Sequence, residues 1–143
     1  MNEINFLNAD ESLLPEICNR ILHEFYGCKV FLLSGEPGAG KTTLVRNFCS
    51  ILGVTDEVCS PTYTIINEYH TRTGEKIYHI DLYRLKNKEE AVEAGVIDIL
   101  DRTNWTFIEW YQILSEYIDR NAVIIKMEKT EDAKRNIFAE YLK

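Results

Sequence analysis

The chain of 143 residues lacks the features that mark membrane-spanning and exported proteins. No stretch approaches the roughly 18 consecutive apolar residues that a membrane span needs. Residues 1–5 offer neither the basic start nor the apolar core of a signal peptide. We therefore expect a cytoplasmic protein with no membrane association.

Paired cysteines and metal-binding histidines are also missing. The four cysteines form no C-x-x-C pair and lie in or beside apolar segments, which favours buried, reduced thiols over metal ligands or disulfides: Cys18, Cys28, Cys49 and Cys59. No H-E-x-x-H and no G-x-S-x-G occurs, so neither metalloprotease nor acyl-enzyme chemistry has support. We interpret the three histidines as surface or packing residues: His23, His70 and His79.

The chain has too few basic residues for a protein that binds nucleic acid without the help of a partner. The chain holds 16 Lys and Arg against 23 Asp and Glu, a net charge of −7. Any nucleic acid involved is expected to be held by another protein. With 45% hydrophobic residues and no repeat, linker or low-complexity tract, we expect residues 1–143 to form a single domain with little room for an added lid or second module.

One motif stands out against this ordinary composition. Residues 35–43 read G-E-P-G-A-G-K-T-T, between the apolar run 30–33 and the helix-like stretch 44–52. This fits G-x-x-x-x-G-K-[ST], the phosphate-binding P-loop, with a buried strand before it and a helix after it. Glycines let backbone N–H groups curl around a phosphate, and the helix N-terminus favours the anion.

The P-loop indicates that the chain binds a nucleoside triphosphate with Mg²⁺. Lys41 adds positive charge at the β- and γ-phosphates, and Thr42 places a hydroxyl where Mg²⁺ would sit. The residues assigned to nucleotide binding from the motif are Glu36, Pro37, Gly38, Ala39, Gly40, Lys41, Thr42 and Thr43.

Two strands joined by a turn follow the P-loop helix. Residues 65–69 and 76–81 alternate in polarity around the turn 71–75, which predicts an antiparallel pair. Before them, Ser60, Thr62 and Thr64 form a hydroxyl-rich loop. This loop either satisfies a turn or acts as a switch that meets the γ-phosphate and Mg²⁺, and the pattern leaves both interpretations open.

Two apolar strands end in an acid. Residues 76–81 end at Asp81, in the manner of a Walker B strand, and residues 106–109 end at Glu109. Because ligands collect at the carboxyl ends of parallel strands, we expect both acids beside the P-loop. Two carboxylates near a triphosphate suggest a magnesium site and a means to position water, although a strand-end Asp can also cap the next segment of the chain.

The remaining segments complete an α/β pattern. We expect a strand over 4–7 and helices over 13–26, 88–94, 96–102 and 111–118. Strands over 122–128 and 137–142 are expected to form a terminal hairpin. The predicted fold is therefore a single P-loop NTPase domain of the α/β class, with a mostly parallel central sheet flanked by helices and antiparallel hairpin additions.

Taken in order, four strings resemble the bacterial TsaE (YjeE) family, the small ATPase of tRNA threonylcarbamoyladenosine biosynthesis. They are residues 35–43, the S-P-T-Y-T of 60–64, the Y-H-I-D-L-Y-R-L of 78–85 and the I-E-W of 108–110. The resemblance implies slow, Mg²⁺-dependent ATP hydrolysis. It also implies partners, TsaB and TsaD, which transfer threonylcarbamoyl to the adenosine beside the anticodon of tRNA, and a chain that is monomeric alone.

The resemblance also implies residue roles. By motif position Lys41 holds the β- and γ-phosphates, Thr42 and Glu109 hold Mg²⁺, and Asp81 acts on metal or water. Thr62 and Thr64 would supply the switch hydroxyls, so that the implied catalytic set is Lys41, Thr64, Asp81 and Glu109.

Two further residues are implied by the resemblance, each beside a departure from the family pattern. Trp110 would lie close to the nucleotide, and Tyr111 stands where relatives usually carry proline. Arg135 would contact the nucleotide, and Ala133 and Lys134 precede it where the family usually has a glycine before the arginine.

Three other functions share the P-loop. A small-molecule kinase needs a lid and an acceptor pocket, for which residues 86–102 offer little space. A GTPase is disfavoured because residues 87–90 match N-K-x-D only up to the final position, which is Glu90, and no D-x-x-G follows the P-loop. A nucleotide-dependent binding module, in which hydrolysis is incidental, stays open.

Overall fold

The computed structural model describes residues 3–56, 58, 65–100, 103–118, 121–131 and 133–142. These residues form both strands and helical segments. The strands are β1 (Glu3–Ala9), β2 (Val30–Ser34), β3 (Ile66–His70), β4 (Lys76–Asp81), β5 (Trp105–Glu109), β6 (Val123–Lys129) and β7 (Arg135–Tyr141). The helical segments are η1 (Glu11–Leu13), α1 (Leu14–Glu24), α2 (Lys41–Ile51), α3 (Lys88–Glu93), α4 (Val96–Ile99) and η2 (Tyr111–Tyr117).

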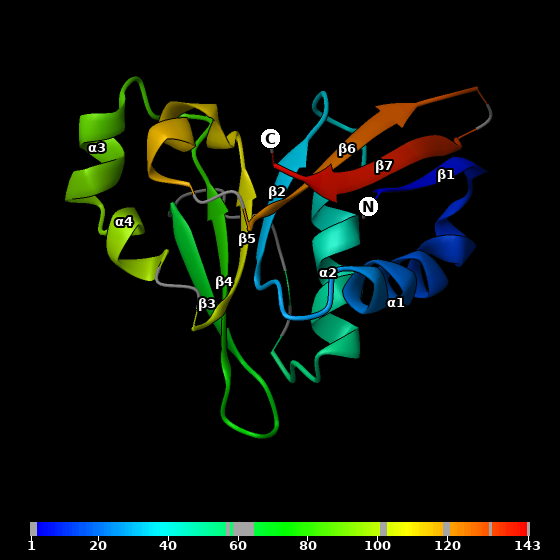
Figure 1. Ribbon diagram of the computed structural model, residues 1–143, viewed down its shortest axis with the longest axis horizontal. Helices are drawn as coiled ribbons and strands as arrows, with labels where there is room; N and C mark the ends of the chain where they lie inside the picture. The colour runs from blue at the N-terminus through cyan, green and yellow to red at the C-terminus, as the bar shows by residue number, and fades with distance from the viewer. Residues whose placement is uncertain are drawn as a thin grey trace.

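All seven of these strands join one sheet in the order β1-β7-β6-β2-β5-β4-β3. The four middle strands, β6, β2, β5 and β4, run parallel. Antiparallel strands extend the sheet at both sides, β7 and β1 on one and β3 on the other. The expected α/β fold is confirmed, including both hairpins, β3–β4 and β6–β7 (Figure 1).

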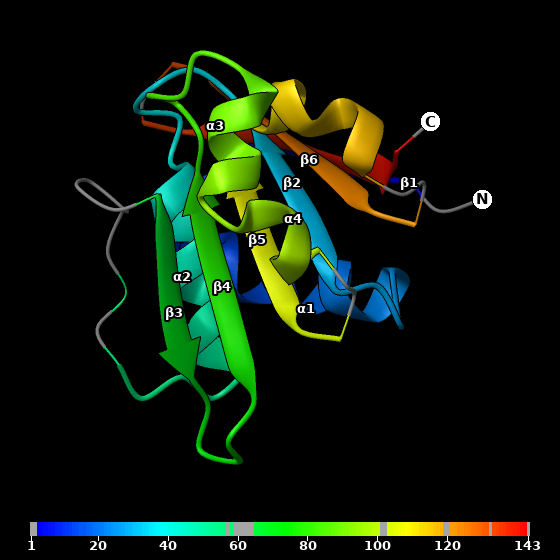
Figure 2. The same ribbon diagram turned by 90° about the vertical axis from the view of Figure 1, so that its left-hand side faces the viewer.

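Two hydrophobic layers hold the sheet between helices. β2 is buried on both sides, with Phe31 and Leu33 in the layer under α1 and α2, and Val30 and Leu32 in the opposite layer. Figures 1 and 2 show α1 and α2 on one face of the sheet, and α3 and α4 on the other. A strand covered on both faces is apolar throughout, which is why residues 30–33 read as a continuous hydrophobic run.

Two predicted helices differ from the structure in their geometry. The helix expected over 13–26 is preceded by the 3₁₀ turn η1, where the Asp10 side chain accepts a hydrogen bond from the Ser12 amide. The segment expected as an amphipathic helix over 111–118 is the 3₁₀ helix η2. Segment η2 follows Trp110, whose left-handed backbone conformation differs from that of an ordinary helix start.

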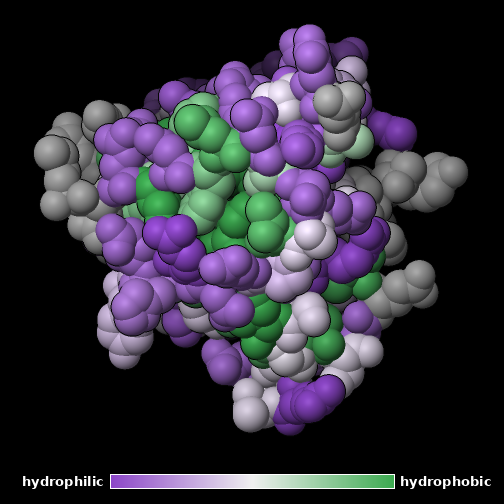
Figure 3. Space-filling view, turned by 90° about the vertical axis from the view of Figure 1, so that its right-hand side faces the viewer, coloured by the Kyte–Doolittle hydropathy of each residue, from purple (hydrophilic) through white to green (hydrophobic). Residues whose placement is uncertain are grey.

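The exposed edge of the sheet is irregular. β1 pairs with β7, but the register shifts between Phe6 and Ala9, and Asn8 adopts a φ of 51°. Figure 3 shows that this side of the molecule carries apolar patches among largely hydrophilic atoms. Leu7 of β1 is 66% exposed and Leu13 of η1 is 43% exposed. A bulge of this kind bends an edge strand and opposes further strand pairing.

The described cysteines agree with the expectation of buried, reduced thiols. Cys18, Cys28 and Cys49 are free and buried, while Cys59 lies outside the described residues. Burial raises the pKa of the Cys49 thiol to about 12. None of the helices formed by the described residues combines the length and apolar character that a membrane crossing needs.

Truncating the aromatic centre of the larger layer is expected to destabilise the fold. The Phe48 ring centroid lies 5.6 Å from that of Phe31 and 5.1 Å from that of Phe107, and all three side chains are fully buried. Phe48→Ala should lower the free energy of unfolding in urea by about 3–5 kcal/mol. Tyr26→Ala, at a side chain 90% exposed, is the control and should change it by less than about 0.5 kcal/mol. Equal effects of the two substitutions would contradict this packing.

Candidate nucleotide-binding site

The P-loop connects the end of β2 to the start of α2. Gly40 precedes Lys41 with a φ of 100°, and a Cβ built there would meet Nη1 of Arg135 at 2.0 Å. A Cβ on Gly35 would lie 2.6 Å from the carbonyl oxygen of Met127. Glycine is required at Gly35 because the loop passes so close to the backbone of β6, and at Gly40 because residues with a Cβ rarely adopt its positive φ.

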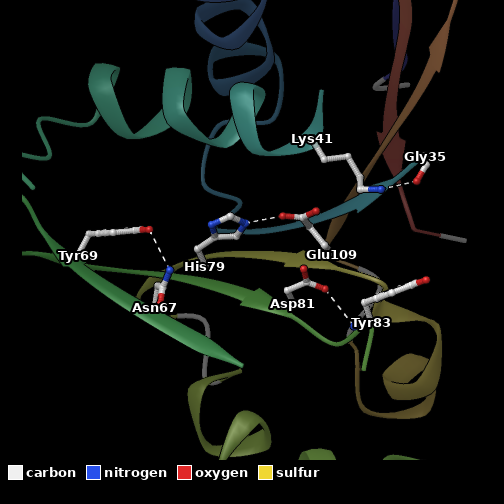
Figure 4. A network of polar contacts seen from close by, with 8 residues as sticks. All are labelled: Gly35, Lys41, Asn67, Tyr69, His79, Asp81, Tyr83 and Glu109. Atoms are coloured by element: carbon white, nitrogen blue, oxygen red, sulfur yellow. Dashed lines mark hydrogen bonds and ion pairs between the residues drawn. The ribbon is translucent and has the colours of Figure 1, made fainter. Parts of the chain in front are cut away.

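Lys41 is the first residue of α2, and it is buried although it is charged. Its ammonium group donates a hydrogen bond to the carbonyl of Gly35, which places it across the mouth of the loop (Figure 4). Its Nζ also lies 4.9 Å from the centroid of the Trp110 ring. A carbonyl and an aromatic face therefore stabilise this ammonium group where a phosphate is expected.

The two predicted acids arrive together at the carboxyl ends of neighbouring strands. In the parallel pairing, Leu33 of β2 lies opposite Glu109 of β5, and Glu109 lies opposite Asp81 of β4. Both carboxylates project to the side of the sheet that α2 covers (Figure 4). Because β5 lies between β2 and β4, Glu109 stands on the strand next to the P-loop strand, and Asp81 stands one strand further away.

A cavity of about 540 Å³ joins the loop to these acids. Its lining combines the start of α2, the two carboxylates and two aromatic side chains: Pro37, Gly38, Gly40, Lys41, Thr42, Thr43, Asp81, Tyr83, Glu109 and Trp110. A smaller cavity of about 290 Å³ adjoins it and is lined in part by Glu36, Pro37 and Gln112. The structure thus brings most of the sequence-predicted site residues to one place.

Some predicted site residues are not among those that line either cavity. Ala39 packs its methyl group into the core. Arg135, the first residue of β7, lies on the hairpin side of the loop, with Nη1 3.5 Å from the carbonyl oxygen of Ala39. Thr62 and Thr64, predicted as switch hydroxyls, lie outside the described residues.

The segments that follow β5 and β4 bring two aromatic rings to the cavity, those of Trp110 and Tyr83. Trp110 adopts a left-handed backbone conformation with a φ of 59°, which is uncommon for a residue other than glycine. Its ring centroid lies 4.9 Å from that of Tyr83, whose side chain is largely exposed. The sequence indicated Trp110 but gave no signal for Tyr83, because an aromatic residue two positions after Asp81 is compatible with simple packing.

The surroundings of Asp81 disfavour its ionised form. Burial raises the pKa of the Asp81 carboxyl, and the nearby Glu109 acts in the same direction. The amide N–H of Tyr83, which donates to Oδ1 at 3.0 Å, opposes this shift, as does the positive charge of Lys41. The ionised form is therefore short of compensating positive charge.

His79 makes a contact that the sequence did not predict. The sequence predicts a surface or packing residue, and the structure buries His79 completely, as expected for packing, but also places its Nε2 2.6 Å from Oε2 of Glu109. Alternation along β4 puts His79 and Asp81 on the same face of the sheet. That alternation was available in the sequence, but the partner strand that makes the contact was not.

A further cavity, of about 650 Å³, lies at the opposite end of the parallel strands, where they begin. It is lined where β2 begins, by residues that include Tyr26, Lys29, Val30 and Asn121. Although it is larger, it has neither a glycine loop nor a helix N-terminus among its lining residues. Phosphate recognition in α/β sheets uses the carboxyl ends of the strands, so the cavity at the P-loop is the better nucleotide site.

Replacing Asp81 by asparagine is expected to stabilise the chain in the absence of metal and nucleotide. A carboxyl whose pKa is raised by folding destabilises the folded state once it ionises, and an amide removes this cost while its oxygen still accepts from Tyr83. Asp81→Asn should therefore raise the midpoint of thermal unfolding at neutral pH. The gain should shrink as the pH falls through the raised pKa of the folded Asp81 carboxyl towards 3.8, the ordinary value, and should be absent below it, where the carboxyl is protonated in both states. A gain that grew towards low pH would contradict this assignment.

Comparison with known proteins agrees with this geometry. The family described as "Threonylcarbamoyl adenosine biosynthesis protein TsaE" matches residues 8–137. The tRNA threonylcarbamoyladenosine biosynthesis protein TsaE of Haemophilus influenzae is 38% identical over 105 residues, which are 73% of this chain and 65% of that protein. The protein of the same name from Rickettsia bellii is 36% identical over 118 residues, 78% of each chain.

The fold has a solved counterpart as well. The crystal structure of YdiB from Bacillus subtilis matches with a TM-score of 0.71 and 23% identity, covering 99% of this chain and 86% of that one. This structural match shows the fold, and the sequence matches show the family. With the P-loop, the two strand-end acids and the sheet order in place, the chain belongs to the TsaE family.

Proposed function

We propose that this chain is a Mg²⁺-dependent ATPase that supports threonylcarbamoyladenosine modification of tRNA. The observation that carries the proposal is the single cavity in which the P-loop lysine, Lys41, faces the two strand-end acids, Asp81 and Glu109. The relatives' names refer to the tRNA modification pathway, and membership of the TsaE family brings that pathway to this chain as a proposal.

The loop and the lysine bind the phosphates in this proposal. Backbone N–H groups of residues 38–43 and the N-terminus of α2 face the β- and γ-phosphates. Lys41 exchanges its hydrogen bond to the Gly35 carbonyl for one to a phosphate oxygen, which keeps the buried ammonium group paired throughout. Arg135 approaches the same loop from the hairpin side, next to the Ala39 carbonyl, and is proposed as a further nucleotide contact.

The oxygen donors at the cavity fit Mg²⁺. Thr42, Asp81 and Glu109 line it, and Mg²⁺ prefers one or two protein carboxylates together with phosphate oxygens and water. No cluster of three His, Cys, Asp or Glu suited to a metal occurs among the described residues, so the nucleotide would complete the coordination. When bound, the ion would neutralise phosphate charge. It would also supply the positive charge that the buried Asp81 lacks.

The wider proposals concern the chain and its partners. We propose one domain over residues 1–143, because the strands of the described part form one continuous sheet. We also propose that the chain is monomeric alone, since a bulge interrupts the exposed β1 edge.

The proposed partners are TsaB and TsaD, which would hold the tRNA. The proposed compartment is the cytoplasm. An acidic chain with a net charge of −7 suits indirect contact with tRNA. Thr62 and Thr64 are proposed as switch hydroxyls.

A kinase is the less favoured alternative. Between β4 and β5 the described chain forms only the short helices α3 and α4, and both contribute to the hydrophobic layer on the face away from α2. Among the described residues that line the 540 Å³ cavity, Lys41 is the only Lys or Arg. A kinase usually adds arginines from a lid, and this lining provides none.

The first test is ATP hydrolysis by the purified chain with Mg²⁺, with and without its cognate TsaB and TsaD proteins and tRNA. We expect weak activity alone and a clear increase with the partners. Lys41→Ala should weaken ATP binding by about 10–100-fold, the usual effect of losing a charge-assisted hydrogen bond, and should abolish the partner-dependent increase. Lys76→Ala, an exposed lysine at the start of β4, should behave as wild type.

Two outcomes would contradict the proposal. Normal hydrolysis by Lys41→Ala would remove the assigned role of the P-loop. A high rate of ATP hydrolysis that does not change when the partners are added would favour the kinase. The next step would then be a search for a phosphorylated acceptor. Support of repeated tRNA modification by a non-hydrolysable ATP analogue would instead favour a binding module with incidental hydrolysis.

Glu109→Ala should separate hydrolysis from nucleotide binding. Because the carboxylate is proposed to act on the metal, Mg²⁺-dependent hydrolysis should fall by about 100-fold, while ATP affinity without Mg²⁺ changes little. Glu75→Ala, at an exposed position in the β3–β4 turn, is the control. Calorimetric titration with ATP and a steady-state ATPase assay provide the two measurements. Equal loss of binding and hydrolysis would point to a folding defect and contradict the metal role.

A further inference from the structure

We propose that His79 is a positioning residue that holds the Glu109 carboxylate by one oxygen and leaves the other directed at the cavity. The inference rests on the proposed function, in which Glu109 acts on nucleotide-bound Mg²⁺. It extends that function to a residue of β4 that does not line the cavity itself.

The contact arises from the parallel pairing of β4 and β5. Asp81 lies opposite Glu109 in this pairing, and His79 lies two residues before Asp81 on the same face of the sheet. Nε2 of His79 reaches diagonally to Oε2 of Glu109 at 2.6 Å. Figure 4 shows the imidazole beside the carboxylate, both beneath α2. Strand geometry therefore fixes the origin of both side chains, and the hydrogen bond fixes the rotation of the carboxylate.

Burial makes this hydrogen bond important for the site. The side chain of His79 is fully buried, and that of Glu109 is 5% exposed. A carboxylate this far from water needs a hydrogen-bond donor, and among the described residues His79 is the one in contact with it. Only Oε2 takes part in that bond, so Oε1 keeps its lone pairs for a metal ion or a water molecule.

The other imidazole nitrogen indicates how the bond is made. Nδ1 of His79 is buried and has no hydrogen-bond partner among the residues that the structure describes. An ionised carboxylate can only accept, so the nitrogen that faces Glu109 carries a proton, and a second proton on Nδ1 would leave a buried N–H unpaired. Nε2 therefore carries the proton and donates it to Glu109, and the imidazole serves as a fixed donor.

A fixed Glu109 also keeps Lys41 available. The buried ammonium group and the carboxylate line the same cavity, and opposite charges in a poorly hydrated site attract each other strongly. A freely rotating Glu109 side chain would compete with the phosphates for Lys41. The bond to His79 opposes that rotation, so each charged group keeps its own task.

The test compares His79→Gln with His79→Asn. Both variants place an amide in the same buried position, but only the longer glutamine side chain carries its N–H donor close to the place of Nε2. We expect His79→Asn to lower Mg²⁺-dependent ATP hydrolysis by about 10–100-fold, as is usual when an outer-shell partner of a metal ligand is lost. His79→Gln should recover most of the rate. His70→Gln and His70→Asn, at an exposed histidine on β3, are the matched controls.

A second measurement does not depend on turnover. Calorimetric titration should show that Mg²⁺ strengthens ATP binding to wild type and to His79→Gln, and that this effect is reduced in His79→Asn. ATP affinity without Mg²⁺ should agree within about twofold in all three, because His79 does not touch the phosphate-binding loop. Thermal unfolding of each variant reports any loss of folding separately.

The double variant decides whether His79 acts through Glu109. In a Glu109→Gln background, His79→Asn should lower the rate no further, because the group it positions has already lost its charge. Additive losses, or equal activity of His79→Asn and His79→Gln, would overturn the inference while the proposed function stands. A wild-type chain in which Mg²⁺ alters neither ATP affinity nor hydrolysis would overturn the proposed function, and the inference with it.

Discussion

The parallel pairing of β2 with β5 and β6 is the constraint on which the site depends. With a partner on each side and helices over both faces, β2 has no freedom to shift, so the loop that leaves it at Gly35 starts from a fixed point. The pairing with β5 brings Glu109 level with Leu33, and the next pairing brings Asp81 level with Glu109. Main-chain register therefore places the charged groups, and side-chain contacts only refine them.

The sequence predicted much of this because the relevant signals are local. A continuous apolar run, a glycine loop and a helix identify β2 and the P-loop, and strands that end in acids place Asp81 and Glu109 at the same edge. The order of the strands in the sheet could not be predicted from local signals, because β4 and β5 are both apolar segments that end in a carboxylate. Only long-range packing determines that β5 lies next to β2, and hence that Glu109 stands closer to the loop strand than Asp81.

His79 shows the same limit at the level of one residue. Its alternation with Asp81 indicated the face it occupies, but a histidine on an apolar face is compatible with ordinary packing. Its role appears only when β5 supplies Glu109 at 2.6 Å. The 3₁₀ winding of η2 has a related origin, since it comes after the left-handed Trp110, whose conformation the sequence did not indicate. In both cases the informative contact joins segments that are distant in the chain or depends on one uncommon dihedral angle.

These features share an energetic cost that the rest of the fold offsets. Lys41 is a buried cation, Asp81 is a half-buried acid with a raised pKa, and Trp110 holds an uncommon backbone conformation. Each reduces the stability of the free chain, and together they surround one cavity. The apolar area buried in the two hydrophobic layers on either side of β2 offsets the cost of these three residues. A triphosphate with Mg²⁺ would neutralise both signs of charge at once, so the same arrangement that weakens the free chain favours the bound state.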